Sequence, residues 1–442
     1  MFDLLIKNGN VWGPAGAEIM DVGIIQGKIH ALGHLDLAGK QIIDADGLEV
    51  IPGAIDTQVH FREPGLEQKE NLESGSRSAV LGGITGYFEM PNTNPGTTTR
   101  DAVLDKLQRA QQSSWCDYAF YVGASGDNVA QLPELEMMHG VCGIKIFMGS
   151  STGNLLVADD ETLLRVLRSG RRRVAIHAED EERLIDRKPY RKIGDPSSHP
   201  IWRDPESAIL ATKRIINLSK KAHRRIHVLH ITTSDEVDLL ANVKDLVSAE
   251  VTPQHLTLFA PDCYERLGTL AQMNPPIREN SHRIGLWRGV QTGVFDVVGS
   301  DHAPHTLEEK AQKYPDSPSG MTGVQTLLPV MLRHVCEGRL SMQRLIDLTS
   351  AGPARLFGLM GKGRIARGFD ADLTLVDMKA QHEFDNLQVG SRTKWSPFAG
   401  EVFPAWPVYT IVRGHVVMKE GRLQEPNAQA IRFFETEQVR AD

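Results

Sequence analysis

The stretch IDTQVHFREPG, residues 55–65, decides more about the fold of this chain than any other. It begins as an apolar strand and ends in polar residues and a Pro-Gly turn. Because side chains alternate along a strand, Gln58, His60 and Arg62 are predicted to lie on one face and to share one cavity. The stretch therefore predicts a buried strand that delivers polar groups to its carboxyl end.

Seven further apolar runs follow, and helical patterns fill the gaps between them. The eight strands are expected at residues 51–60, 84–90, 118–124, 143–148, 173–177, 226–230, 247–253 and 295–301. Helices are expected at residues such as 101–114, 159–169, 205–220 and 233–243. Eight alternating strand and helix units predict an α/β protein with parallel strands closed into a TIM-type (β/α)8 barrel.

The two ends of the chain have a different pattern, with short strands broken by turns. Residues 4–6 and 22–25 near the start, and 371–377 and 409–414 near the end, read as strands. We expect residues 1–52 and 358–442 to form one small discontinuous β-domain, and residues 53–357 to form the barrel. A chain of 442 residues has room for both, since a barrel takes about 250.

The composition is that of an ordinary globular protein, with 41% apolar and 24% charged residues. A formal net charge of −7 argues against a nucleic-acid partner and favours a small-molecule substrate. The N-terminus lacks the features of a signal peptide, and no apolar run reaches about 18 residues. Four scattered cysteines suit reduced thiols. We therefore expect a cytoplasmic protein that is not attached to a membrane.

Two basic runs, residues 171–173 and 220–225, each lie between a helical pattern and an apolar strand pattern. We interpret them as solvated turns that also suit the carboxyl ends of helices. A patch that binds phosphate or nucleic acid is the less favoured alternative.

Polar residues that can do chemistry gather at the carboxyl ends of the predicted strands. In a barrel this edge carries the active site, because the loops there converge around the axis. The residues are Gln58, His60, Asn92, Lys145, His177, His230, Asp301 and His305.

The histidines of this set predict a metal site, since imidazole nitrogens suit zinc and similar ions. The ligands would be His60, His177 and His230. Asp301 could touch both a metal and its bound water, and it is the predicted catalytic proton carrier. Lys145 stands in an apolar strand, where an ammonium is costly to bury unless it is paired or modified. The plainer alternative is a lysine whose head extends from the strand end to solvent.

Several motifs together resemble the amidohydrolase superfamily, and within it the dihydroorotases. The resemblance covers essentially the whole chain. Its motifs are FREPG at 61–65, MPNTNP at 90–95, MNPPIR at 273–278, DHAPH at 301–305 and WSPF at 395–398.

The resemblance implies the ligand set and the reaction. One metal would lie near His60, Lys145 and Asp301 and a second near Lys145, His177 and His230, with one or two Zn2+ per chain and Lys145 carbamylated. The substrate carboxylate would be held by Arg62, Asn92 and His305. Asn274 would contact the pyrimidine ring or only shape a turn. The reaction implied is the reversible cyclisation of N-carbamoyl-L-aspartate to L-dihydroorotate in de novo pyrimidine (UMP) biosynthesis.

One position departs from the family pattern. Where the family has His-x-His, this chain has Gln58 before His60. An amide oxygen is a poorer zinc ligand than imidazole. Both a site with a single metal and a two-metal site of altered geometry stay open.

Two other functions are weighed against this one. A related cyclic amidohydrolase, such as an allantoinase or dihydropyrimidinase, would share the barrel but would give Arg62 no anionic partner. A non-catalytic partner of aspartate transcarbamoylase would explain Gln58 but not the other ligand positions. The resemblance also implies a homodimer.

Overall fold

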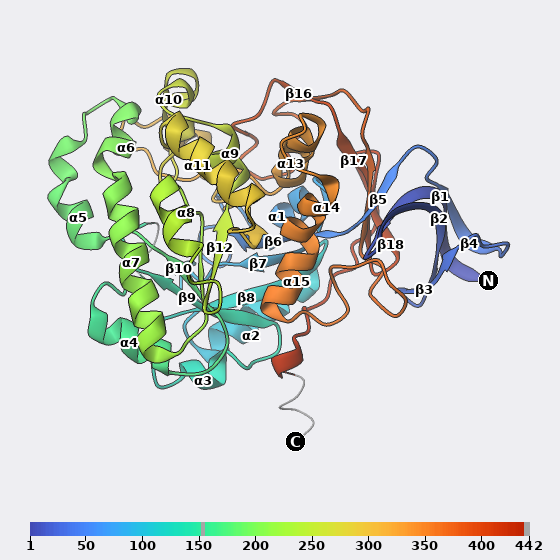
Figure 1. Ribbon diagram of the computed structural model, residues 1–442, viewed down its shortest axis with the longest axis horizontal. Coiled ribbons are helices and arrows are strands. Elements are labelled where there is room, and N and C mark those ends of the chain that lie inside the picture. Colours follow the sequence, from blue (N-terminus) through green and yellow to red (C-terminus); the bar gives the residue numbers. More distant parts are fainter. Residues whose placement is uncertain (152–154, 437–442) are drawn as a thin grey trace.

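The computed structural model describes residues 1–151 and 155–436. Eight parallel strands form one sheet in the order β13-β12-β11-β10-β9-β8-β7-β6. A parallel bridge joins Val59 to His302, and the backbone N–H of His60 donates to the carbonyl of His302 at 2.7 Å. Because these contacts connect the first strand to the end of the last, the predicted TIM-type barrel is confirmed (Figure 1).

All eight predicted runs overlap a barrel strand, and helices cover the outside of the barrel (Figure 1). The strands are β6 (Ala54–Val59), β7 (Ile84–Glu89), β8 (Asp117–Gly123), β9 (Val141–Phe147), β10 (Val174–His177), β11 (Ile226–Val228), β12 (Val247–Val251) and β13 (Val297–Val298). The helices are α1 (Leu72–Leu81), α2 (Arg100–Ser113), α3 (Leu132–Leu135), α4 (Asp160–Arg168), α5 (Glu181–Asp186), α6 (His199–Trp202), α7 (Pro205–Ala222), α8 (Ser234–Leu240), α9 (Pro253–Thr257), α10 (Asp262–Leu267), α11 (Asn280–Gln291), α12 (Leu307–Lys310), α13 (Leu327–Cys336), α14 (Met342–Ile346) and α15 (Gly352–Phe357).

The longest helix, α7, shows how local sequence sets the limits of these elements. The side chain of Asp204 accepts a hydrogen bond from the backbone N–H of Ser207, and Pro205 occupies the first turn. The helix ends at His223, whose φ of 51° places it in the left-handed region. One side of α7 is buried, and α7 also contacts α4 and α8. The caps therefore set where α7 begins and ends, and its apolar residues set which side packs inward.

A second sheet combines strands from both ends of the chain. Its order is β19-β18-β17-β14-β5-β1-β2-β3, with β4 paired to β1. The strands are β1 (Phe2–Gly13), β2 (Gly16–Ile25), β3 (Lys28–Gly33), β4 (Gly39–Asp44), β5 (Glu49–Pro52), β14 (Leu373–Asp377), β17 (Trp406–Val412), β18 (His415–Lys419) and β19 (Arg422–Leu423). Strand β5 joins the two parts, because it pairs with β1 on one side and β14 on the other.

The limits predicted for the small domain, residues 1–52 and 358–442, stay a prediction. A separate pair of strands, β15 (His382–Phe384) and β16 (Glu401–Phe403), lies inside the second range. Its apolar side chains pack in one cluster with Met273 and Val330 of the barrel segment. Part of the C-terminal segment thus packs against the barrel rather than within the second sheet.

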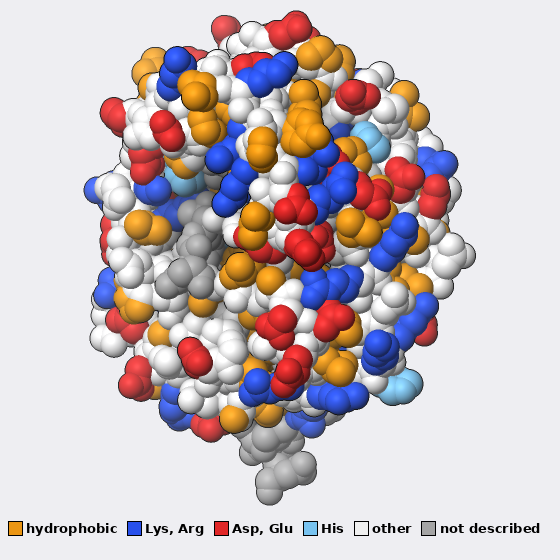
Figure 2. Space-filling model, turned by 90° about the vertical axis from the view of Figure 1, so that its left-hand side faces the viewer, with side chains coloured by type: hydrophobic (Ala, Val, Ile, Leu, Met, Phe, Trp, Pro, Cys, Tyr) orange, Lys and Arg blue, Asp and Glu red, His pale blue; other side chains and the backbone are white. Residues whose placement is uncertain are grey.

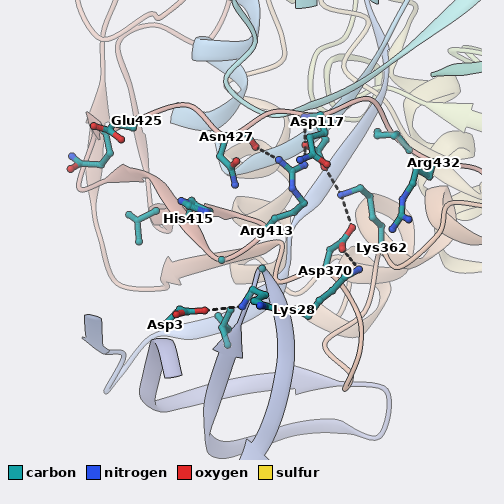
Figure 3. Close-up of a pocket in the computed structure, with 18 of the residues that line it drawn as sticks. Asp3, Lys28, Asp117, Lys362, Asp370, Arg413, His415, Glu425, Asn427 and Arg432 are labelled. Atoms are coloured by element: carbon teal, nitrogen blue, oxygen red, sulfur yellow. Dashed lines mark hydrogen bonds and ion pairs between the residues drawn. The ribbon is translucent and has the colours of Figure 1, made fainter. Parts of the chain in front are cut away.

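A buried ion network ties the second sheet to the barrel (Figure 3). The Nζ of Lys362 lies 2.7 Å from Asp117 at the start of β8, 2.5 Å from Asp372 and 3.3 Å from Asp370. Burial alone would lower the pKa of Lys362, but the three carboxylates outweigh it and raise that pKa well above its usual range. A buried charge needs such partners, so the network holds the two sheets together at the amino-terminal end of the barrel strands.

The interpretation of the two basic runs as solvated turns is wrong for Arg172 and Arg224, which are buried. Both contact the buried carboxylate of Glu136. Its Oε1 accepts from the backbone N–H of Arg172 at 3.1 Å, and its Oε2 lies 2.6 Å from Nη2 of Arg224. Each run therefore supplies one internal ion-pair or hydrogen-bond partner as well as exposed charges.

Charges of both signs are interspersed over the face drawn in Figure 2, and that face has no extended basic field. A nucleic-acid surface would need such a field. Among the helices of the described residues, none combines the length and apolar character needed to cross a membrane.

Candidate active site

One cavity at the carboxyl ends of the barrel strands brings most of the predicted residues together. Its lining includes Gln58, His60, Arg62, Asn92, Lys145, His177, His230, Asn274 and Asp301. His305 lines an adjoining outer cavity instead. The two cavities share Ser151, Asn274 and Ser319, so the outer one leads to the inner one.

Three of these residues have an unusual backbone. Arg62, His230 and Asp301 have φ values of 66°, 38° and 45°. Residues other than glycine rarely adopt this left-handed region, and such strain clusters at functional sites. Each of the three lies just beyond the end of a barrel strand, where the chain turns sharply and aims its side chain into the cavity.

His177 and His230 form a pair whose geometry suits a metal ion. Nδ1 of His177 lies 3.0 Å from Nε2 of His230, and Nε2 of His177 lies 3.0 Å from the carboxylate of Glu179. Glu179 therefore fixes the proton on Nε2 and leaves the Nδ1 lone pair facing His230. Two nitrogens on one tetrahedral zinc would lie roughly 3.3 Å apart. A small shift would therefore let one ion fit between the two rings.

Glu179 is itself held in place. Nε of Arg203 donates to both carboxylate oxygens at 3.1 Å, and Nη2 of Arg203 donates to the carbonyl of Ser150 at 2.8 Å. Burial would raise the pKa of Glu179, but Arg203 and His177 hold it well below its usual range. A charged carboxylate thus stands behind His177 and links it to the loop after β9.

His60, Asp301 and Gln58 form a second group. Oδ1 of Asp301 lies 3.2 Å from Nε2 of His60 and accepts a hydrogen bond from Nε2 of Gln58 at 3.0 Å. Nδ1 of His60 lies 2.7 Å from Oδ1 of Asn92. Burial lowers the pKa of His60, which favours the neutral imidazole that a metal needs.

Lys145 stands between these groups without a carboxylate at ion-pair distance among the described residues. Its Nζ lies 4.5 Å from the centre of the Phe147 ring, and the side chain is 1% exposed. Burial lowers the pKa of Lys145 to about 7. Its charge in turn lowers the pKa of His60, His177 and His230, and its side chain lines the same cavity as these three imidazoles.

The donor set fits a metal only if Lys145 takes part. Within residues 1–151 and 155–436, no three His, Cys, Asp or Glu side chains converge closely enough to hold an ion alone. The pair His177 and His230 is one ligand short, and so is the pair His60 and Asp301. A carbamate on Lys145 would supply an anionic oxygen beside the histidine pair.

Arg62 is a buried cation without a counter-ion in hydrogen-bond contact. Its Nε donates to the carbonyl of Pro304 at 3.3 Å, and Nη2 lies 3.4 Å from Nε2 of His305. Nη1 is buried, and the described part of the chain offers it no hydrogen-bond partner. Burial lowers the pKa of Arg62 to about 10. A guanidinium in this state is suited to an anionic ligand.

His305 contacts two neighbouring residues through its ring nitrogens. Its Nδ1 lies 3.1 Å from the ammonium of Lys69, and its Nε2 lies 3.1 Å from the carbonyl of Ser319. Burial lowers the pKa of His305 to about 3, so the neutral ring accepts from Lys69 and donates to Ser319. A direct contact with a ligand carboxylate requires this N–H to leave Ser319.

Asn274 has a fixed orientation. Nε2 of the buried His199 lies 2.9 Å from Oδ1 of Asn274, and burial lowers the pKa of His199 to about 3. The neutral imidazole donates to the amide oxygen, which leaves the amide nitrogen of Asn274 as the group for a ligand.

Sequence reasoning missed Glu179, Arg203 and His199. Glu179 follows His177 by two positions, so strand alternation could have placed both on one face. Arg203 and His199 come from the segment before α7, and their sequence positions carry no comparable signal.

Three comparisons with known proteins agree on the family. A sequence model described as the amidohydrolase family matches residues 50–417. A dihydroorotase of Halobacterium salinarum is 38% identical over 91% of this chain and 94% of that protein. An allantoinase of Rubrobacter xylanophilus is 36% identical over 96% and 95%. A solved L-hydantoinase (dihydropyrimidinase) from Arthrobacter aurescens has a TM-score of 0.92, at 32% identity over 98% and 100%.

Proposed function

The chain belongs to the amidohydrolase family, and we propose that within it the protein is a dihydroorotase. It would interconvert N-carbamoyl-L-aspartate and L-dihydroorotate in the cytoplasm, as a step of pyrimidine biosynthesis. The dihydroorotases among the relatives, at 31–38% identity, support this proposal. The observation that carries it is the buried guanidinium of Arg62 in the cavity, whose Nη1 has no hydrogen-bond partner among the described residues.

Arg62 separates this substrate from the alternatives because only dihydroorotate brings a carboxylate. The rings of allantoin, hydantoin and dihydrouracil are neutral and would leave Nη1 of Arg62 buried without a partner. An unsatisfied buried polar group costs about 1–3 kcal/mol, and more when it is charged. The carboxylate would lie between Arg62 and the amide of Asn92, with His305 as a third partner after its N–H leaves Ser319.

The metal site is part of the same proposal. The residues that would hold zinc are His177, His230 and carbamylated Lys145, with His60 and Asp301 on the opposite side of the cavity. Zinc bound here would lower the pKa of a bound water and polarise the ring carbonyl. Carbamylation joins the neutral Lys145 amine to CO2 and releases one proton. The buried position of Lys145, which has no carboxylate at ion-pair distance within residues 1–151 and 155–436, supports it.

Asp301 would move the proton that the reaction transfers. In the hydrolytic direction the attacking water forms a C–O bond at the ring carbonyl and the ring C–N bond breaks. Asp301 takes a proton from the water and delivers it to the leaving nitrogen. In the cyclising direction the same carboxylate removes the proton from the attacking ureido nitrogen and returns it to the departing water.

The experiment is a substrate panel with purified protein supplied with zinc and bicarbonate. We expect opening of L-dihydroorotate and closure of N-carbamoyl-L-aspartate, with allantoin, hydantoin and dihydrouracil turned over at least about a hundredfold more slowly. Preference for a neutral ring would refute the assignment. No turnover of any ring by metal-loaded protein would favour the non-catalytic alternative. Size-exclusion chromatography, alone and with aspartate transcarbamoylase, tests the proposed homodimer and association.

A further inference from the structure

The amide of Gln58 is oriented by its contact with Asp301. Nε2 of Gln58 lies 3.0 Å from Oδ1 of Asp301. The reverse orientation would set the amide oxygen against a carboxylate oxygen, and two acceptors repel. Oε1 of Gln58 is buried and has no hydrogen-bond partner among the described residues. Gln58 therefore acts toward Asp301 as a hydrogen-bond donor.

This orientation weakens one of the two metal positions that the family implies. The position near His60 and Asp301 loses the imidazole that His-x-His would supply. To coordinate an ion, Gln58 would have to offer Oε1, a poorer zinc ligand. The carboxylate oxygen that would face the ion already accepts from Gln58 and lies 3.2 Å from His60.

The position near His177 and His230 is built much more completely. The two imidazole nitrogens already lie 3.0 Å apart. Behind His177, the buried Glu179 and Arg203 fix the ring's proton and orientation. Such outer partners typically account for about 10–100-fold in metal affinity. Nδ1 of His60 contacts the amide of Asn92 instead, and the part of the chain that the structure describes places no carboxylate there.

We propose that the protein holds one metal ion per chain, at Lys145, His177 and His230, and that Gln58 is a positioning residue for Asp301. The amide donor does the work that a first metal would do, which is to hold the carboxylate toward the reacting water. The inference rests on the proposed function for the metal site at Lys145, His177 and His230 and for the role of Asp301, but the number of metal ions can be measured without any turnover.

The test counts metal ions in three forms of the full chain. Wild-type protein, Gln58→His and Gln58→Leu are loaded with zinc and bicarbonate, desalted and analysed by plasma mass spectrometry. We expect about one zinc per chain in the wild type and in Gln58→Leu, and about two in Gln58→His, which restores the imidazole. With Mn2+, electron paramagnetic resonance should show isolated ions in the first two forms and a coupled pair in the third.

Kinetics then test the positioning role. Gln58→Leu is similar in size but cannot donate, so we expect kcat to fall about tenfold or more while KM and the zinc content stay within about twofold. Two zinc ions or a coupled manganese pair in the wild type would overturn the inference, and so would an unchanged kcat in Gln58→Leu. If the protein holds one zinc ion but does not act on dihydroorotate, the inferred number of metal ions stands and only the proposed substrate is rejected. Circular dichroism of each variant identifies any that fails to fold, and Gln58→Asn, whose shorter amide falls short of Asp301, then replaces it.

Discussion

Replacing Arg62 tests the substrate assignment most directly. Arg62→Gln removes the guanidinium whose Nη1 has no hydrogen-bond partner among the described residues. A substrate carboxylate buried there without its partner loses about 3–4 kcal/mol, within the range for breaking a buried charged pair. This corresponds to a fall of about 10²–10³ in kcat/KM for L-dihydroorotate. Arg62→Lys keeps the charge but loses the planar fork, so we expect an intermediate loss.

The free energy of unfolding should change much less than kcat/KM in Arg62→Gln. Burial lowers the pKa of Arg62, which means that its charge is disfavoured in the folded protein before substrate binds. Arg62→Gln loses one hydrogen bond, to the carbonyl of Pro304, which is long at 3.3 Å; the 3.4 Å approach to Nε2 of His305 is a contact between two N–H groups. We therefore expect the free energy of unfolding to change by no more than about 1 kcal/mol.

The assay compares kcat/KM for dihydroorotate with urea unfolding of the same samples. Arg100→Gln is the matched control, because Arg100 is exposed and pairs with Glu134 at the surface; it should change neither quantity. Equal losses on dihydroorotate and on a neutral cyclic amide would show that Arg62 supports the site generally. The carboxylate reasoning would then be wrong.

Three further changes probe the supporting structure. Glu179→Gln removes the anion behind His177, so the zinc dissociation constant, measured by chelator competition, should rise about 10–100-fold; an unchanged constant would contradict that role. Lys362→Met leaves buried carboxylates without their cation and should destabilise the fold by about 3–5 kcal/mol in urea unfolding at pH 7, whereas a neutral effect would mean that the network is dispensable. Burial would raise the pKa of Glu70, but hydrogen bonds from His302, Ser391 and Ser74 outweigh it and lower that pKa from 4.5. The charged carboxylate of Glu70 therefore stabilises the fold fully above pH 4.5, and this contribution is lost as the pH falls through the lowered pKa. Glu70→Gln should make the free energy of unfolding depend less on pH in this acidic range. The same dependence on pH in the wild type and the variant would exclude Glu70 as its source.

The sequence could predict the barrel because its signals are local. Each strand is a short apolar run, and the rule that active-site residues lie at the carboxyl ends of barrel strands places His60, His177 and His230 near one another. The structure brings nine of the ten predicted site residues to one cavity. His305 lines the outer one, and its partners Lys69 and Ser319 could not be read from spacing.

What the sequence could not predict depends on contacts between distant segments. Glu136 binds Arg224 from 88 residues away, and nothing in a basic run distinguishes an internal arginine from a solvated one. The orientation of the Gln58 amide is set by Asp301, 243 residues later. Composition and periodicity describe single elements, whereas hydrogen-bond direction is decided only when two elements meet.

The relatives show where the substrate must be decided. Dihydroorotase, allantoinase and L-hydantoinase all appear among them at 34–38% identity over nearly the same length, so the barrel itself does not separate acidic from neutral rings. In the proposed mechanism the histidine pair and Lys145 would hold the metal that acts on the cyclic amide bond, which every one of these substrates contains. In the same proposal Arg62, which also lines the cavity, would face the part of the substrate that differs. The assignment as a dihydroorotase therefore depends on whether Arg62 is paired by the substrate carboxylate.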